Sequence, residues 1–145
     1  MALAEHPRRT SHPTDHETAV HFGHWVDYRW SRPQAYPELV ADMVRAMDNT
    51  HPHHSHRDQT AGVLLSMAES ARYIALQPPA NRERLGAERI ADPRILSATL
   101  YEAAYKIAGD YVAAGGSETA QAKACVGYQF EALAGLVDLA KDEQL

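Results

Sequence analysis

The chain has 145 residues, a formal net charge of −5 and a hydrophobic share of 45%. This length suits one domain with one core, and the acidic balance argues against nucleic acid as the main partner. The single cysteine, Cys125, excludes an intramolecular disulfide and a cysteine-based zinc motif. No apolar run is long enough to cross a membrane, and we expect no signal peptide and no membrane partner. The sequence therefore favours a cytoplasmic protein.

The first 30 residues contain one segment that can be interpreted in two ways. Residues 1–13 have no periodicity, and we expect an irregular arm ahead of a single helical domain over residues 14–145. Residues 14–30 begin with a capping box and have apolar residues at helical spacing, but their apolar residues also fall on even positions, as in a strand. We favour a helix, because no second strand is visible to pair with this one. A strand that pairs across a dimer is the alternative.

The middle of the chain predicts three helices. Pro37 suits the first turn of a helix that ends near Asn49, and residues 50–57 then form a loop. A second helix begins at Asp58 or Thr60 and stops at Pro78. Residues 80–91 predict a short, heavily charged helix.

Two long helices are predicted in the last third of the chain. Asp92 caps the first, the glycines at 115 and 116 end it, and Ser117 caps the second. The first helix is apolar on two adjacent faces, so it is either central or buried at a subunit interface. We expect a long antiparallel hairpin of two helices of about 20 residues each.

The second long helix shows a clear apolar stripe at alternating spacings of four and three residues. Its members are Val126, Phe130, Leu133, Val137 and Ala140. We expect this stripe to face the core, with Leu100, Ile107, Phe130 and Leu133 buried. Small residues that would let a neighbouring helix approach closely are Ala120, Ala124, Gly127, Ala134 and Gly135. The predicted fold class is therefore all-α, a small helical bundle of five to six helices with a long C-terminal antiparallel helical hairpin.

All nine histidines lie between His6 and His56. Zinc needs about four N, S or O ligands on rigid elements. The candidate metal ligands are His21, His24, His51, His53, His54 and His56. A polar, solvated histidine-rich loop is the favoured interpretation, and no cofactor is expected. A divalent transition metal (zinc, nickel or iron) is the alternative.

Aromatic residues supply the second group of candidates, as anchors for a protein partner. Tryptophan, tyrosine and arginine dominate the binding energy of interfaces. The candidate interaction residues are Trp25, Tyr28 and Trp30 near the N-terminus, and Tyr101, Tyr105 and Val112 on the second stripe of the first long helix. Packing of one tryptophan against the hairpin is the favoured alternative for the N-terminal group.

No constellation of catalytic residues is recognisable, and no catalytic residue is assigned. Cys125 lies among small apolar residues, as a core cysteine does. The leading hypothesis is a non-enzymatic helical interaction protein (an adaptor, regulator or assembly subunit) that binds a protein partner or self-associates as a homo-oligomer. The alternatives are a metal-assisted hydrolase or transferase using the histidine-rich half, and a helical small-molecule binder with a tyrosine-lined pocket.

Overall fold

The computed structural model describes residues 28–50, 57–115 and 120–143. These residues contain helices and no strand, which confirms the all-α class for the part of the chain that they cover. Two 3-10 helices come first, η1 (Tyr28–Ser31) and η2 (Pro33–Ala35). The α-helices that follow are α3 (Tyr36–Thr50), α4 (Arg57–Ala75), α5 (Pro79–Arg84), α6 (Pro93–Gly115) and α7 (Ala120–Asp142). The choice between helix and strand for residues 14–27 falls outside the described residues.

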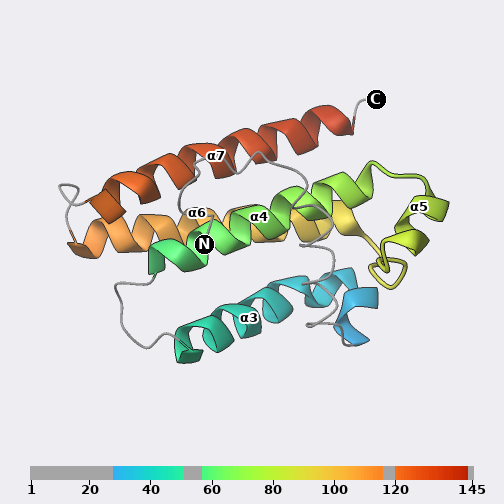
Figure 1. The fold of residues 1–145 in the computed structure, drawn as a ribbon, viewed down its shortest axis with the longest axis horizontal. Coiled ribbons are helices and arrows are strands. Elements are labelled where there is room, and N and C mark those ends of the chain that lie inside the picture. Colours follow the sequence, from blue (N-terminus) through green and yellow to red (C-terminus); the bar gives the residue numbers. More distant parts are fainter. Residues whose placement is uncertain (1–27, 51–56, 116–119, 144–145) are drawn as a thin grey trace.

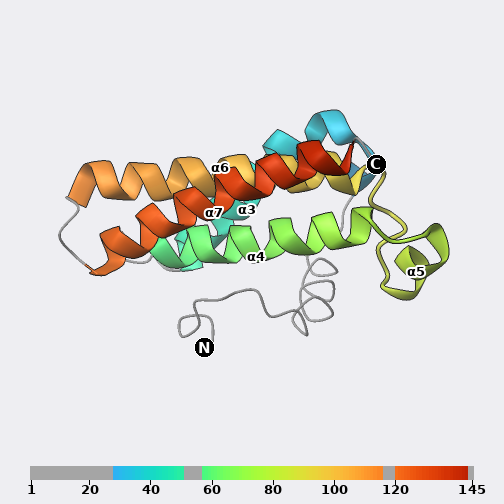
Figure 2. The ribbon, with the colours of Figure 1, turned by 90° about the horizontal axis from the view of Figure 1, so that it is seen from above.

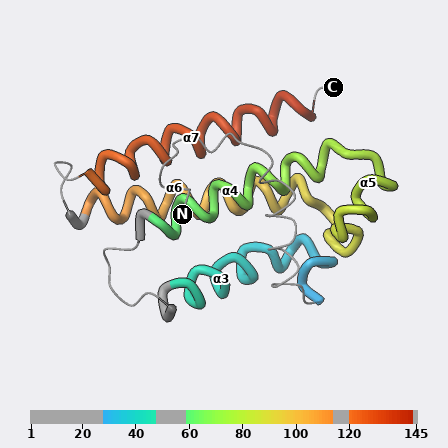
Figure 3. Tube along the Cα trace, in the orientation of Figure 1, coloured from blue at the N-terminus to red at the C-terminus, as the bar shows by residue number. Residues whose placement is uncertain are grey.

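The long helices form three layers. α4 and α6 pack along their lengths as the middle layer, α7 covers one side of this pair, and α3 covers the other (Figure 1). The view from above shows α7 lying across both α6 and α4 (Figure 2). α6 contacts α3, α4 and α7, so the helix with two apolar faces is central in this fold. The chain trace reverses direction between α3 and α4, between α4 and α6, and between α6 and α7 (Figure 3).

The contact between α4 and α6 forms the middle of the core. Leu64 and Leu65 of α4 and Leu96 and Leu100 of α6 are completely buried. Ile107 is also buried, so the predicted burial of Leu100 and Ile107 is confirmed. Ser97 is a buried polar residue of this layer, and its hydroxyl donates a hydrogen bond of 2.7 Å to the carbonyl of Ala68.

A buried junction fastens the first described residues to the start of α6. The hydroxyl of Tyr36 donates to the carbonyl of Trp30 (2.6 Å) and accepts a hydrogen bond from the backbone N–H of Asp92 (3.2 Å). The N–H of Ala91 donates to the same Trp30 carbonyl at 3.1 Å. Trp30 and Tyr36 are both buried, and burial raises the pKa of the Tyr36 phenol because it disfavours the charged form. Trp30 is therefore a core residue.

The structure tests two of the predicted helix ends, the start of α6 and the end of α5. Asp92 caps α6 as predicted, because its Oδ1 accepts a hydrogen bond of 3.1 Å from the N–H of Ile95. The charged helix predicted over 80–91 was too long, since α5 ends at Arg84. The cause is Gly86, whose φ of +72° stops the helix, and the N–H of Ala87 then donates to the carbonyl of Arg82 at 2.9 Å.

Candidate functional site

The buried side of α7 consists mainly of small residues. The buried residues of this helix are Ala122, Cys125, Ala132, Gly135 and Leu139, here called the inner face. Their spacings of three and four residues, or sums of these, put them on one side of the helix. Cys125 is a free cysteine within this face, as predicted for a core cysteine. An inner face this small lets α7 lie close to α4 and α6, and larger side chains of its neighbours fill the space between the helices.

Large aromatic rings pack over glycines at the contacts of α7. A Cβ added at Gly135 would overlap the ring carbons of Tyr101 on α6. At a second contact, the hydroxyl of Tyr128 on α7 lies 3.3 Å from the position that a Cβ at Gly62 on α4 would occupy. Close approach was predicted at Gly135 and occurs there. It does not occur at Gly127, which has nothing within 4 Å of a Cβ position, and Ala120, Ala124 and Ala134 are exposed.

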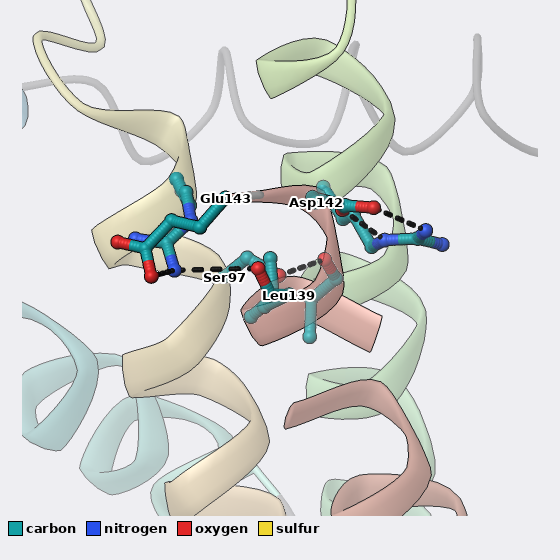
Figure 4. A network of polar contacts seen from close by, with 7 residues as sticks. Ser97, Leu139, Asp142 and Glu143 are labelled. Atoms are coloured by element: carbon teal, nitrogen blue, oxygen red, sulfur yellow. Dashed lines mark hydrogen bonds and ion pairs between the residues drawn. The ribbon is translucent and has the colours of Figure 1, made fainter. Parts of the chain in front are cut away.

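Two arginines hold the last turn of α7 in place. Arg72 of α4 binds Asp142 through two hydrogen bonds, Nε to Oδ2 (2.7 Å) and Nη2 to Oδ1 (3.0 Å). Arg94 of α6 donates to the carbonyl of Leu139 (3.3 Å) and pairs with Glu143 (3.0 Å). Figure 4 shows this last turn between α4 and α6. The hydrogen bonds from Arg72 lower the pKa of the Asp142 carboxyl, because they favour its charged form. The pairs come from two different helices, and they fix the rotation of α7 about its own axis.

The apolar stripe predicted to face the core lies on the opposite side of α7. Phe130 is 69% exposed, Val137 is 54% exposed and Leu133 is 45% exposed. The predicted burial of Phe130 and Leu133 was wrong. The side of α7 that packs in the core carries the mostly small residues of the inner face instead. We call the stripe of Val126, Phe130, Leu133, Val137 and Ala140 the outer seam. Val126 is half-buried, and the other three large residues, Phe130, Leu133 and Val137, are the most prominent run of exposed large apolar side chains along one helix of the described residues.

The spacing of the outer seam is the one that a partner helix needs. Its residues repeat at four, three, four and three positions, which is the a/d pattern of a coiled coil. Side chains at such positions insert between those of a facing helix. Within the described residues no helix faces this side of α7, since its contacts are with α4 and α6. The outer seam is therefore the strongest candidate for a contact surface.

The other predicted interaction residues separate into buried and exposed groups. Trp30 and Tyr101 are buried in the core, and Val112 is partly buried against it. Tyr28 is exposed, with the guanidinium of Arg32 5.0 Å from its ring centroid. Tyr105 is 40% exposed on α6. Trp25 lies outside the described residues. Of this group, Tyr28 and Tyr105 are the side chains that an incoming partner can reach.

The candidate metal ligands cannot be placed. His21, His24, His51, His53, His54 and His56 all lie outside the described residues. In the ranges that the structure describes, no group of three or more His, Cys, Asp or Glu side chains converges on one point. The metal site in the histidine-rich region therefore stays a prediction from the sequence.

The tyrosines do not gather around one cavity in the described part of the chain. A small cavity beside the end of α4 is lined by one tyrosine, Tyr73, together with Gln77, Asn81, Arg84 and Leu85. Tyr101 and Tyr128 instead pack over glycines, and Tyr105 is exposed.

Comparisons with known proteins found no match for this chain, whether among protein families, curated proteins or solved structures. No helix of the described ranges combines the length and the apolar character that crossing a membrane requires.

Proposed function

We propose that this chain is a non-enzymatic helical interaction protein, an adaptor, regulator or assembly subunit of the cytoplasm that binds protein through the outer seam of α7. The observation that carries the proposal is the exposure of Phe130, Leu133 and Val137 at heptad spacing on a helix whose opposite face is packed in the core. An isolated exposed apolar residue is ordinary, whereas an aligned group of large ones is typical of a contact surface.

Two further features support this proposal. The seam lies on a helix that is fixed at its end by Arg72 and Arg94, so the apolar side chains are held in one orientation before a partner arrives. The scaffold that we propose for the whole chain is a small bundle of five to six helices, closed by the C-terminal antiparallel hairpin of α6 and α7. A rigid helical face of this kind suits recognition of a partner helix.

The experiment is cross-linking in living cells that produce the chain. A photo-reactive phenylalanine analogue replaces Phe130 in one strain and Tyr73, an exposed aromatic residue at the far end of α4, in a matched control strain. We expect covalent protein adducts, including adducts to a second copy, from position 130 and few from position 73. Equal or absent adducts at the two positions would contradict the proposed function.

A further inference from the structure

A small cavity, separate from the outer seam, lies between the end of α4 and the short helix α5, which extends beyond it (Figure 1). Its volume is about 140 Å³, and a cavity of roughly this size holds a molecule like benzene. The residues that line it are Tyr73, Gln77, Asn81, Arg84 and Leu85. Arg84 and Tyr73 are exposed, so the cavity can be reached from solvent. No residue of α7 lines it, so a ligand here is independent of the proposed function of the outer seam.

A chain of hydrogen bonds orients the polar side chains around the cavity. Nη2 of Arg84 donates to Oδ1 of Asn81 (2.8 Å), and Nδ2 of Asn81 donates to Oε1 of Gln77 (3.0 Å). A guanidinium can only donate, so Arg84 fixes which way round both amides lie. Each amide oxygen accepts a hydrogen bond from its neighbour in the chain. The groups left for a ligand are therefore mainly N–H donors: the other N–H groups of Arg84, the second N–H of Asn81 and the NH2 group of Gln77.

The backbone at the end of α4 does not cancel this excess of donors. The last turn of a helix exposes carbonyl groups with partial negative charge, which repel an anion. Here Arg82 occupies two of these carbonyls, because its Nε donates to the carbonyl of Ile74 and its Nη2 to that of Ala75, both at 3.1 Å. The positive charge of Arg82 also opposes the negative end of the helix dipole. An anion beside the end of α4 is therefore not repelled as it would be by an uncapped helix.

The cavity carries a positive charge that no carboxylate of the described residues neutralises. Arg84 is the charged residue of the lining, and it forms no ion pair within the described part of the chain. Glu83, the acidic residue of α5, is exposed and does not line the cavity. The whole chain has a formal charge of −5, so the cavity is a local exception. One cation among neutral donors matches a ligand group with one negative charge.

We propose that this cavity binds the carboxylate group of a small organic acid. A carboxylate carries one negative charge and only accepts hydrogen bonds, and its two oxygens fit the paired N–H groups of a guanidinium. A phosphate ester carries about −1.5 to −2 at pH 7 and suits several cations or a helix N-terminus, which the lining residues do not provide. The side chain of Leu85 and the ring of Tyr73 supply an apolar wall for the rest of the molecule. The volume limits that part to about the size of a phenyl ring.

Nuclear magnetic resonance of the full chain, titrated with sodium benzoate to about 20 mM at constant ionic strength, tests the proposal. Benzoate should shift the amide signals of residues 73–85 until they saturate, with a dissociation constant in the millimolar range because the ligand is small. Benzamide has the same shape without the charge, and it should bind at least about tenfold more weakly. The signals of α7 should not change. This comparison of two ligands requires no variant to fold.

Three variants separate the site from a general effect of charge. Arg84→Gln should weaken benzoate binding at least about tenfold. Arg89→Gln removes the same charge at an exposed residue outside the lining, and it should leave the binding unchanged. Gln77→Glu keeps the oxygen that accepts from Asn81 but replaces the NH2 group by a second, charged oxygen, so it should also weaken binding about tenfold or more. Circular dichroism should show unchanged helicity, because these side chains are exposed or half-buried.

The proposal is overturned if benzoate causes no saturable shifts at residues 73–85, or if it binds Arg84→Gln as tightly as the wild type. Equal binding of benzamide would show that the cavity selects the ring and not the carboxylate. Tighter binding of inorganic phosphate than of benzoate would assign the site to phosphates instead. N-acetyl-phenylalanine imitates the carboxyl end of a polypeptide, and it should bind no more tightly than benzoate. Binding about tenfold tighter than that of benzoate would make the occupant the end of a protein and not a small acid.

Discussion

The ring of Tyr101 on α6 occupies the space beside the α carbon of Gly135 where a side chain on α7 would begin. The ring is buried, and it contacts the backbone of α7 through this gap. The contact brings the two long helices together at the level where the inner face of α7 has no side chain. It follows that residue 135 has a size limit that residue 127, on the same helix, does not have.

Gly135→Ala should destabilise the fold by about 1–2 kcal/mol. Overpacking a core costs about 1–3 kcal/mol and sometimes more, whereas replacing a helical glycine by alanine returns about 1 kcal/mol. Gly127→Ala is the matched control, because nothing lies within 4 Å of its Cβ position, and it should stabilise by about 0.5–1 kcal/mol. Urea unfolding at low protein concentration measures both. If both variants gained stability, the ring of Tyr101 would have moved away from Gly135.

Asp142→Asn should weaken the fold by about 1 kcal/mol at pH 7, because it removes the charge that binds Arg72 through two hydrogen bonds. The pKa of Asp142 is lowered in the folded state, so its contribution is present above the ordinary aspartate pKa of about 3.9 and is lost as the pH falls through the lowered value. The difference in unfolding free energy between the wild type and the variant should therefore shrink below about pH 4.

Asp110→Asn provides the comparison for that measurement. Asp110 pairs with Lys106 at 3.1 Å on the exposed side of α6, one turn apart on the same helix. Its loss should cost less than about 0.5 kcal/mol. Equal losses for the two variants would show that Asp142 contributes no more than a surface pair.

Tyr36→Phe should cost about 1–2 kcal/mol, because it removes the hydrogen bond to Trp30 and leaves the N–H of Asp92 without its acceptor. Tyr105→Phe, on the surface of α6, should change the unfolding free energy by less than about 0.3 kcal/mol.

We also expect the stability difference between the wild type and Tyr36→Phe to depend on pH in the alkaline range. The pKa of Tyr36 is raised in the folded state, so the contribution of its neutral phenol is complete below the ordinary tyrosine pKa of about 10 and is lost as the pH rises through the raised value. The deficit of Tyr36→Phe should therefore narrow above about pH 10. Unfolding at pH 8 and pH 11 measures it, and a constant deficit would contradict the burial of this phenol.

Phe130→Ala should cost less than about 1 kcal/mol in the monomer, because the ring is mostly exposed. Leu100→Ala, at a completely buried position of α6, should cost about 2–5 kcal/mol. Thermal unfolding of dilute protein compares the two. A cost for Phe130→Ala as large as that for Leu100→Ala would show that the outer seam is part of the core.

The sequence predicted where helices form better than it predicted which side of each helix faces the core. The cap at Asp92 and the burial of Leu100 and Ile107 follow from local residues and helical spacing, and these were found. The orientation of α7 was reversed, because the longest apolar stripe of a helix is expected to face the core. Here the bulk comes from the neighbouring helix instead, with Tyr101 set against Gly135.

The contacts that fix α7 are also too distant in the chain for a sequence pattern to show. Arg72 and Asp142 are 70 positions apart, and neither belongs to a local motif. The end of α5 was missed for a smaller reason, since the positive φ of Gly86 stops a helix that charge and length alone would have continued. The candidate site was therefore found as a stripe in the sequence and assigned to the wrong side of its helix.

The two faces of α7 tolerate change differently. A side chain at Gly135 would overlap the ring of Tyr101, and Ala132 is completely buried, so few substitutions at these two positions leave the bundle intact. At Phe130, Leu133 and Val137 almost any residue leaves the bundle folded, because these side chains contribute little to the core. Over many generations, point substitutions on a single helix can therefore alter the proposed contact surface without refolding the layers beneath it.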